Sequence, residues 1–128
     1  MKTLFVAGFS VGALLAMSTP VLAADASHGQ TLFRAQCGIC HQAGQDDGDG
    51  GQGPSLKGVI GRKIGGDADY AYSQALSDAK DKWTVDSLAT FLGDPQKALP
   101  GTSMPIKVGN ADERADIAAY LATVKPAP

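Results

Sequence analysis

Two cysteines and one histidine stand close together in the chain, at Cys37, Cys40 and His41. A disulfide between the cysteines would close a very small loop and constrain little of the unfolded chain. A redox dithiol of the thioredoxin kind follows a strand, and no strand-like apolar run precedes Cys37. A structural zinc site takes four ligands, and the other histidine, His28, is distant. The spacing C-x-x-C-H instead predicts covalent haem attachment, in which two thiols on one helical turn bind the porphyrin and His41 is the proximal iron ligand.

The first 23 residues have the order of a secretory signal peptide. Lys2 precedes an uncharged run over 4–17, and Pro20 and the small-residue site 21–23 follow it. A membrane anchor is the alternative, but this apolar run is shorter than the roughly 20 residues that cross a bilayer. We predict cleavage after Ala23, or after Ala24, which leaves one monohaem domain over 24–128 and exports it to the periplasm.

The predicted cleavage removes two of the three methionines and leaves Met104. This residue stands in the turn-rich loop 99–105, between Pro100 and Pro105, whereas a methionine that packs in a core normally lies on a helix face. A thioether is a soft ligand that favours ferrous iron and raises the reduction potential, as suits an electron carrier. Met104 is therefore the candidate for the second axial ligand. His28 is the competing candidate, and its place near the start of a helix indicates a surface residue.

Composition limits the class of protein. The chain has 128 residues, 11 Lys and Arg, 13 Asp and Glu and a formal net charge of −2, so one compact domain is expected, without a basic field for nucleic acid. Sixteen Gly and seven Pro indicate much loop. Because aromatic residues make up only 6%, few large side chains fill the interior, and a bound group would complete the core.

Hydrophobic periodicity predicts helices joined by loops, with no convincing sheet. Three main helices are expected: over 27–37, over 84–92 with Thr84 as N-cap and an end at 94–95, and over 110–124 with Asn110 and Glu113 as a capping box. A short helical turn is expected over 73–79. The loop 42–53 contains an acidic run at 46–50 that lacks the spacing and the glutamate of a calcium loop, so we expect it to be solvated.

Five further motifs follow C-x-x-C-H in order. They are GPSLKG at 53–58, IGRK at 60–63, YAYS at 70–73, WT at 83–84 and PGTSM at 100–104. With these motifs the chain resembles a class I c-type cytochrome, of the mitochondrial type and its soluble bacterial relatives, from Gly29 to Val124. The resemblance implies an all-α cytochrome c fold, with three main helices and short helical turns wrapped around one haem c that is bound covalently through Cys37 and Cys40.

The resemblance also implies roles that periodicity does not assign. Pro54 would offer its carbonyl to the second ring nitrogen of His41 and fix the orientation of the ring. Arg62, Tyr72 and Trp83 would surround a haem propionate and lower the cost of burying this anion. Without the resemblance, Trp83 would be interpreted as a large core side chain. The family pattern also implies a helix crossing, in which Gly29 and Phe33 meet Ile117 and Tyr120.

Three features depart from the mitochondrial pattern. Phe91 stands where those relatives have a tyrosine that can hydrogen-bond the methionine sulfur, so the ligand would lose a donor. Leu76 takes a place often held by asparagine, so the buried water network and the potential should differ. Those relatives also surround the haem edge with lysines that dock acidic partners, whereas the loop after His41 is acidic here. The acidic partners of those relatives are therefore not assumed for this chain.

We predict a monomeric electron carrier that moves one electron at a time between redox proteins of the membrane or periplasm, without binding nucleic acid or staying inserted in the membrane. With His41 and Met104 on the iron, no open coordination site remains, so no enzymatic activity is expected. One alternative is a haem enzyme or gas sensor with an open sixth site and a structural Met104. The other is a haem-free thiol oxidoreductase at Cys37 and Cys40.

Overall fold

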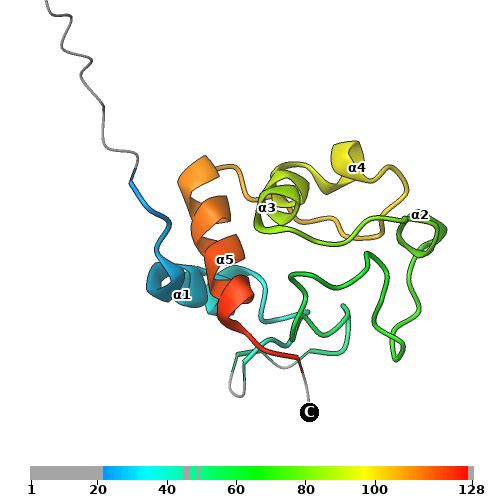
Figure 1. The fold of residues 1–128 in the computed structure, drawn as a ribbon, viewed down its shortest axis with the longest axis horizontal. Coiled ribbons are helices and arrows are strands. Elements are labelled where there is room, and N and C mark those ends of the chain that lie inside the picture. Colours follow the sequence, from blue (N-terminus) through cyan, green and yellow to red (C-terminus); the bar gives the residue numbers. More distant parts are fainter. Residues whose placement is uncertain (1–21, 45–46, 49, 127–128) are drawn as a thin grey trace, which may run out of the picture.

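The computed structural model describes residues 22–44, 47–48 and 50–126, and these ranges contain helices but no strand. The helices are α1 (Ala26–Gln36), α2 (Gln74–Ser77), α3 (Val85–Gly93), α4 (Pro95–Ala98) and α5 (Ala111–Thr123). One isolated bridge joins Lys63 and Lys82. The predicted all-helical fold is confirmed, with α1, α3 and α5 as the three main helices (Figure 1).

The two terminal helices cross closely because α1 has a glycine at the crossing point. Gly29 is buried, and a Cβ atom built on it would lie 1.9 Å from the main-chain oxygen of Asp116 in α5. One turn further along α1, the rings of Phe33 and Tyr120 pack with their centroids 5.6 Å apart. The predicted crossing of Gly29 and Phe33 with the last helix is therefore confirmed, and this pair closes one side of the molecule.

Side-chain caps set the beginnings of the main helices. The carboxylate of Asp25 accepts from the amides of Ser27 and His28 at the start of α1. Thr84 caps α3 as predicted, and it shares a reciprocal capping box with Ser87, which the sequence analysis did not assign. The α5 helix begins after Asn110, whose side chain accepts from the amides of two acidic residues in its first turn.

The connection after α3 differs from the expectation that a proline simply ends this helix. Pro95 ends α3 and also opens the four-residue helix α4, where its fixed φ and missing amide hydrogen suit the first helical position. Asp94 caps α4 by accepting from the amide of Lys97. The turn predicted over 73–79 is the short helix α2. Together α2 and α4 frame the segment that carries Met104 (Figure 1).

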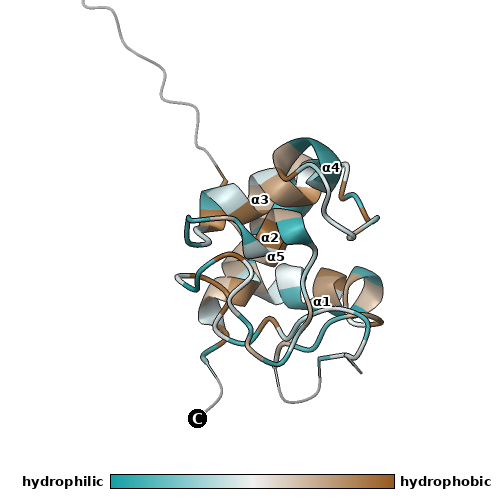
Figure 2. Cartoon of the chain, turned by 90° about the vertical axis from the view of Figure 1, so that its right-hand side faces the viewer, coloured by the Kyte–Doolittle hydropathy of each residue, from teal (hydrophilic) through white to brown (hydrophobic). Residues whose placement is uncertain are grey.

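Apolar side chains from α1, α3, α5 and the loops between them form the core. Its larger side chains include Phe33, Trp83, Leu88, Phe91, Leu92, Ile117, Tyr120 and Leu121. Both hydrophobic and hydrophilic residues occur along α1 and α3 (Figure 2). Trp83 and Phe91 meet edge to face, with their ring centroids 5.1 Å apart. Within the described ranges, no helix is long and apolar enough to cross a membrane. Nearly all of the predicted signal peptide lies outside the described residues.

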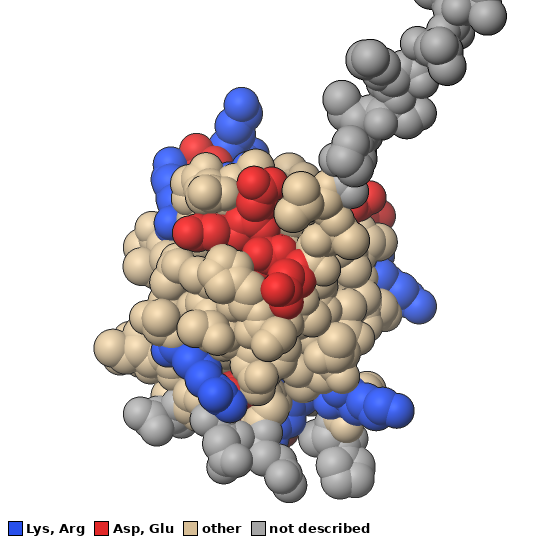
Figure 3. Space-filling view, turned by 90° about the vertical axis from the view of Figure 1, so that its left-hand side faces the viewer, with Lys and Arg blue, Asp and Glu red and all other residues tan. Residues whose placement is uncertain are grey.

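Charged groups on the outside are unevenly distributed. Acidic side chains gather on the side of the molecule where α1 and α5 lie, while lysines and arginines are scattered (Figure 3). Asp25, Asp112 and Glu113 stand at the starts of α1 and α5, and Asp116 lies in the second turn of α5. His28 is exposed, as predicted, and its Nδ1 lies 2.8 Å from a carboxylate oxygen of Asp116.

The expectation of a solvated acidic loop is wrong for Asp47, which is only 2% exposed. Its carboxylate accepts hydrogen bonds from the hydroxyl of Tyr120, from Nε of Arg34 and from Nε2 of Gln30, the last at 3.0 Å. Burial alone would raise the pKa of Asp47, but these three donors outweigh it and hold the pKa below its usual value. Asp47 is therefore fastened to α1 and α5. The acidic residues at 46 and 49 lie outside the described residues.

Candidate cofactor site

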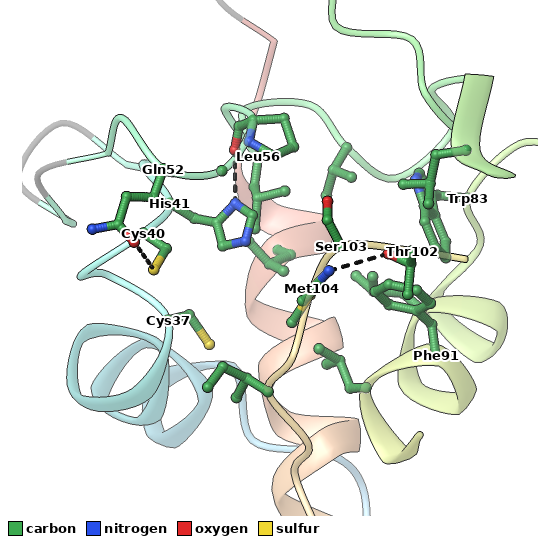
Figure 4. A pocket seen from close by; sticks show the side chains of 18 of the residues that line it. Cys37, Cys40, His41, Gln52, Leu56, Trp83, Phe91, Thr102, Ser103 and Met104 are labelled. Carbon is green, nitrogen blue, oxygen red and sulfur yellow. Dashed lines mark hydrogen bonds between the residues drawn. The ribbon is translucent and has the colours of Figure 1, made fainter. Parts of the chain in front are cut away.

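A cavity of about 620 Å³ lies between the helices and the two loops that follow α1 and α4 (Figure 4). Its volume falls in the range of small-molecule and cofactor sites. All eight residues that the sequence analysis assigned to a cofactor line it: Cys37, Cys40, His41, Pro54, Arg62, Tyr72, Trp83 and Met104. They come from separate segments of the chain, and the fold brings them to one place.

The two cysteines lie at the end of α1, where the chain turns into the pocket wall. Cys37 is the C-cap of α1, and its carbonyl accepts from the amides of Cys40 at 3.1 Å and His41 at 3.0 Å. This turn brings both thiols and the histidine to one side of the cavity (Figure 4). Burial raises the pKa of Cys37 to about 11, and the neighbouring Cys40 adds to the shift. A thiol oxidoreductase needs a lowered thiol pKa, so this environment opposes that alternative.

His41 is held by its neighbours in the orientation that a metal ligand requires. Its Nδ1 lies 2.8 Å from the carbonyl oxygen of Pro54, so Nδ1–H donates there and Nε2 carries the free lone pair. Gly53 packs against the imidazole so closely that an added Cβ would lie 2.3 Å from its Cε1 atom. Burial lowers the pKa of His41, although the Pro54 bond acts in the opposite direction. The ring is thus kept neutral, which is the form that binds a metal.

Met104 enters the same cavity from the loop after α4 (Figure 4). Its amide donates to Oγ1 of the buried Thr102 at 3.4 Å. The carbonyl of Thr102 in turn accepts from Nε2 of Gln96 at 2.5 Å. These bonds tie the loop to α4, so that the half-buried thioether is part of an ordered wall. In the sequence, Thr102 stands out only as part of the motif PGTSM, and its anchoring role appears only in the fold.

The far wall of the cavity offers donors to an anion. The guanidinium of Arg62 donates to the carbonyls of Ser55 at 2.8 Å and Lys57 at 3.3 Å, while its buried Nε has no hydrogen-bond partner. A buried donor without a partner is costly unless a ligand satisfies it. The Tyr72 hydroxyl accepts from the amide of Asp67 at 3.2 Å, which leaves its own hydrogen free to donate. Burial raises the pKa of Tyr72, so this hydroxyl stays protonated.

Trp83 is joined to this wall through the backbone. Its amide donates to the carbonyl of Arg62 at 2.9 Å, and its carbonyl accepts from the amide of Gly61 at 2.7 Å. The indole is buried against Phe91, so its packing role is directly visible. The thiols, a neutral imidazole, a thioether, apolar walls and an unpaired guanidinium nitrogen together form a donor set that fits haem c.

One contact near His41 was missed by the sequence analysis. Tyr70 donates from its hydroxyl to the carbonyl of Gln52 at 2.9 Å, next to the glycine that packs on the histidine ring. Tyr70 and Tyr72 also meet edge to face at 4.9 Å. The motif YAYS contained both tyrosines, but only the fold shows that Tyr70 supports the loop beside His41. Leu76 and Phe91, two of the three departures from the mitochondrial pattern, line the cavity with apolar atoms.

Comparison with known proteins identifies the same family as the sequence motifs. The family model described as Cytochrome c matches residues 26–125. Cytochrome c of Tetrahymena pyriformis is 42% identical over 101 residues, which cover 78% of this chain and 89% of that protein. Cytochrome c2 of Rhodopseudomonas palustris is 36% identical over 118 residues, covering 79% and 99% of the two chains.

Solved structures agree as well. Cytochrome cH from Methylobacterium extorquens is 39% identical with a TM-score of 0.68, over 77% of this chain and 98% of that one. Cytochrome c2 from Rhodospirillum centenum is 29% identical with a TM-score of 0.71, over 80% and 99%. The chain therefore belongs to the cytochrome c family of electron carriers, and its cofactor is haem c, bound covalently through Cys37 and Cys40.

Proposed function

We propose that this cytochrome is a periplasmic one-electron carrier whose iron is held by His41 and Met104. The observation that carries the proposal is that an oriented, neutral imidazole and a thioether enter the same cavity as the two cysteines. Bound haem supplies an iron that alternates between Fe(III) and Fe(II). The chain's residues hold the ligands in place and keep water out, so that little rearranges when the charge changes.

The two ligand segments have different supports. His41 is fixed by Pro54 and Gly53, whereas Met104 depends on the anchoring of its loop through Thr102. A thioether favours Fe(II), so Met104 raises the reduction potential relative to a harder ligand. Phe91 is an apolar neighbour without a donor for the sulfur. If His41 and Met104 both hold the iron, no ligand position would remain for substrate or gas, which supports a carrier without enzymatic activity.

Arg62, Tyr72 and Trp83 would receive a haem propionate. The unpaired Nε of Arg62 supports this role most directly, because it is a buried cationic donor that the protein itself leaves unsatisfied. The Tyr72 hydroxyl supplies a second donor toward the same anion. A carboxylate accepting both bonds would be stabilised by charge-assisted hydrogen bonding. Trp83 would contribute by excluding water from the pair.

The first 23 residues support the proposed export to the periplasm. The charged start, apolar run and small-residue site over 1–23 are those of a signal peptide. The family match begins at residue 26, after the proposed cleavage at Ala23 or Ala24. The mature domain over 24–128 would then shuttle as a monomer between donor and acceptor proteins.

The test is the visible spectrum and reduction potential of the mature protein and of Met104→Ala. The variant should lose the sulfur-to-iron charge-transfer band and show a lower potential, while Ser103→Ala, an exposed neighbour, should keep both. An unchanged spectrum in Met104→Ala would mean that another residue is the ligand. Rapid binding of carbon monoxide by the native protein at neutral pH would instead favour the enzyme or sensor alternative.

A further inference from the structure

One buried carboxylate lies outside the wall of the cofactor cavity. Asp47 is 2% exposed and does not line the cavity. Its donors reach it from both terminal helices, Gln30 and Arg34 from α1 and Tyr120 from α5. Burying a carboxylate is costly, and an ion pair in the interior is weak evidence of a gain in stability. The position of Asp47 in the fold indicates a different role.

The segment that contains Asp47 packs against the turn that carries His41. Gly48 has a φ of +97°, and a Cβ atom built on it would lie 2.6 Å from the carbonyl oxygen of Gly38 and nearer still to that of His41. A Cβ atom built on Gly38 would in turn lie 3.2 Å from Cα of Gly48. The carbonyl of Asp47 accepts from the amide of Ala43 at 3.2 Å, just after His41 in the chain. Main chain therefore meets main chain at this turn, with no side chain between them.

His41 is thus supported at two places. Pro54 and Gly53 hold its imidazole ring, whereas Gly48 packs on its main chain. This packing depends on an anchor that keeps the segment against the turn. The carboxylate of Asp47 is such an anchor, because it binds two helices that are themselves packed together.

We propose that Asp47 is a positioning residue for the proximal iron ligand. Its carboxylate ties the segment to α1 and α5, the segment holds the main chain of His41, and the imidazole plane therefore keeps one orientation toward the haem. This inference rests on the proposed ligation by His41 and adds a second support for that ligand. The lowered pKa of Asp47 agrees with it, because the group is ionised at neutral pH and keeps its charge-assisted bond to Arg34.

A fixed imidazole matters for electron transfer, because movement of a ligand between the two oxidation states slows the exchange. With its main chain loosened, the imidazole is free to tilt even while Pro54 still binds Nδ1. Removal of the Asp47 anchor should therefore change the spectrum of the bound haem and slow electron exchange, besides any loss of stability. A carboxylate that only stabilises the fold would change neither.

The experiment compares haem-loaded Asp47→Ala with the native protein, under conditions in which circular dichroism shows both to be folded. The NMR shifts of the haem methyl groups near Fe(III) report the orientation of the axial imidazole, and exchange broadening of these signals reports electron self-exchange. Asp47→Ala should rearrange the methyl shifts and slow self-exchange several-fold. Asp47→Asn retains one acceptor oxygen, so its values should lie between those of the native protein and Asp47→Ala.

Thr84→Ala is the matched control, because it destabilises α3 by removing its cap and leaves Asp47 and its donors in place. It should keep the native methyl shifts and exchange rate. If Asp47→Ala does not fold, Tyr120→Phe replaces it in the comparison. This variant removes one of the three donors and should produce the same changes at a smaller size.

Native methyl shifts and a native exchange rate in whichever of these two variants folds would overturn the proposal, because Asp47 would then act on stability alone. Equal changes in Thr84→Ala would overturn it too. Absence of axial imidazole signals from the Fe(III) spectrum of the native protein would refute ligation by His41 itself. Presence of these signals together with an unaffected Asp47 variant refutes only the positioning role, so the two failures are distinguishable.

Discussion

Tyr120→Phe should separate the hydrogen bond to Asp47 from the packing of the aromatic ring. The substitution keeps the ring against Phe33 but removes one of three donors to a carboxylate that is 2% exposed. Hydrogen bonds to charged groups contribute about 1.5–3 kcal/mol. We therefore expect the free energy of unfolding near neutral pH to fall by about 2 kcal/mol.

The loss should depend on pH in a defined direction. The donors hold the folded-state pKa of Asp47 below its unfolded value, so their contribution is complete above the unfolded pKa and disappears as pH falls through the folded pKa. The pKa of Tyr120 is raised to about 12, chiefly by burial and then by Asp47, so the hydroxyl remains a donor throughout. In acid, where the carboxyl is protonated, the cost of Tyr120→Phe should shrink to that of a neutral hydrogen bond, about 1 kcal/mol.

Denaturant unfolding of the haem-loaded protein, followed by circular dichroism, measures both values. Tyr70→Phe is the control: it removes a bond to the neutral carbonyl of Gln52, so its smaller cost should not vary with acidification. A double-mutant cycle of Tyr120→Phe with Asp47→Asn should show coupling above about 1 kcal/mol. The same cost for Tyr120→Phe at neutral and acidic pH, or additive effects in the cycle, would refute the buried-carboxylate account.

Further variants test the helix framework. Gly29→Ala adds a Cβ against the main-chain oxygen of Asp116, so thermal unfolding should show that the free energy of unfolding falls by about 2–3 kcal/mol, although alanine has the better helix propensity. Gly109→Ala is the control, because the added Cβ meets open space there, and it should leave the stability nearly unchanged. Thr84→Ala removes the cap of α3 and should cost about 1 kcal/mol in denaturant unfolding. The hydrogen bond to Asp116 raises the pKa of His28. The stability that this pair contributes should therefore be complete below the pKa of His28 in the unfolded chain, and be lost as pH rises through its pKa in the folded protein. NMR titration of His28, with and without Asp116→Asn, measures the shift.

The main helices and the C-x-x-C-H turn were predictable because their signals are local, whereas the roles of Pro54, Arg62, Tyr72 and Trp83 were implied only by the family resemblance. Thr84 and Asn110 precede apolar repeats and cap the helices that follow them. The three residues at 37, 40 and 41 lie on one turn, so spacing alone reports their geometry. Met104 was identified by elimination and by its unusual loop. The short helices were less predictable. The sequence indicates that Pro95 ends α3, but the start of α4 at the same proline also depends on the side chain of Asp94, which caps this helix.

Asp47 shows why the remaining contacts could not be predicted. An acidic run between glycines is normally solvated, and nothing nearby in the chain contradicts that interpretation. The donors that bury this carboxylate are 13, 17 and 73 positions away, at Arg34, Gln30 and Tyr120, and each is of an ordinary residue type. These donors meet at Asp47 because α1 and α5 pack with their main chains in close contact at Gly29. Looser packing between α1 and α5 would therefore also weaken the hydrogen bonds to Asp47. Gly29→Ala should accordingly raise the solvent exposure of Asp47 toward the value that is expected for an acidic loop.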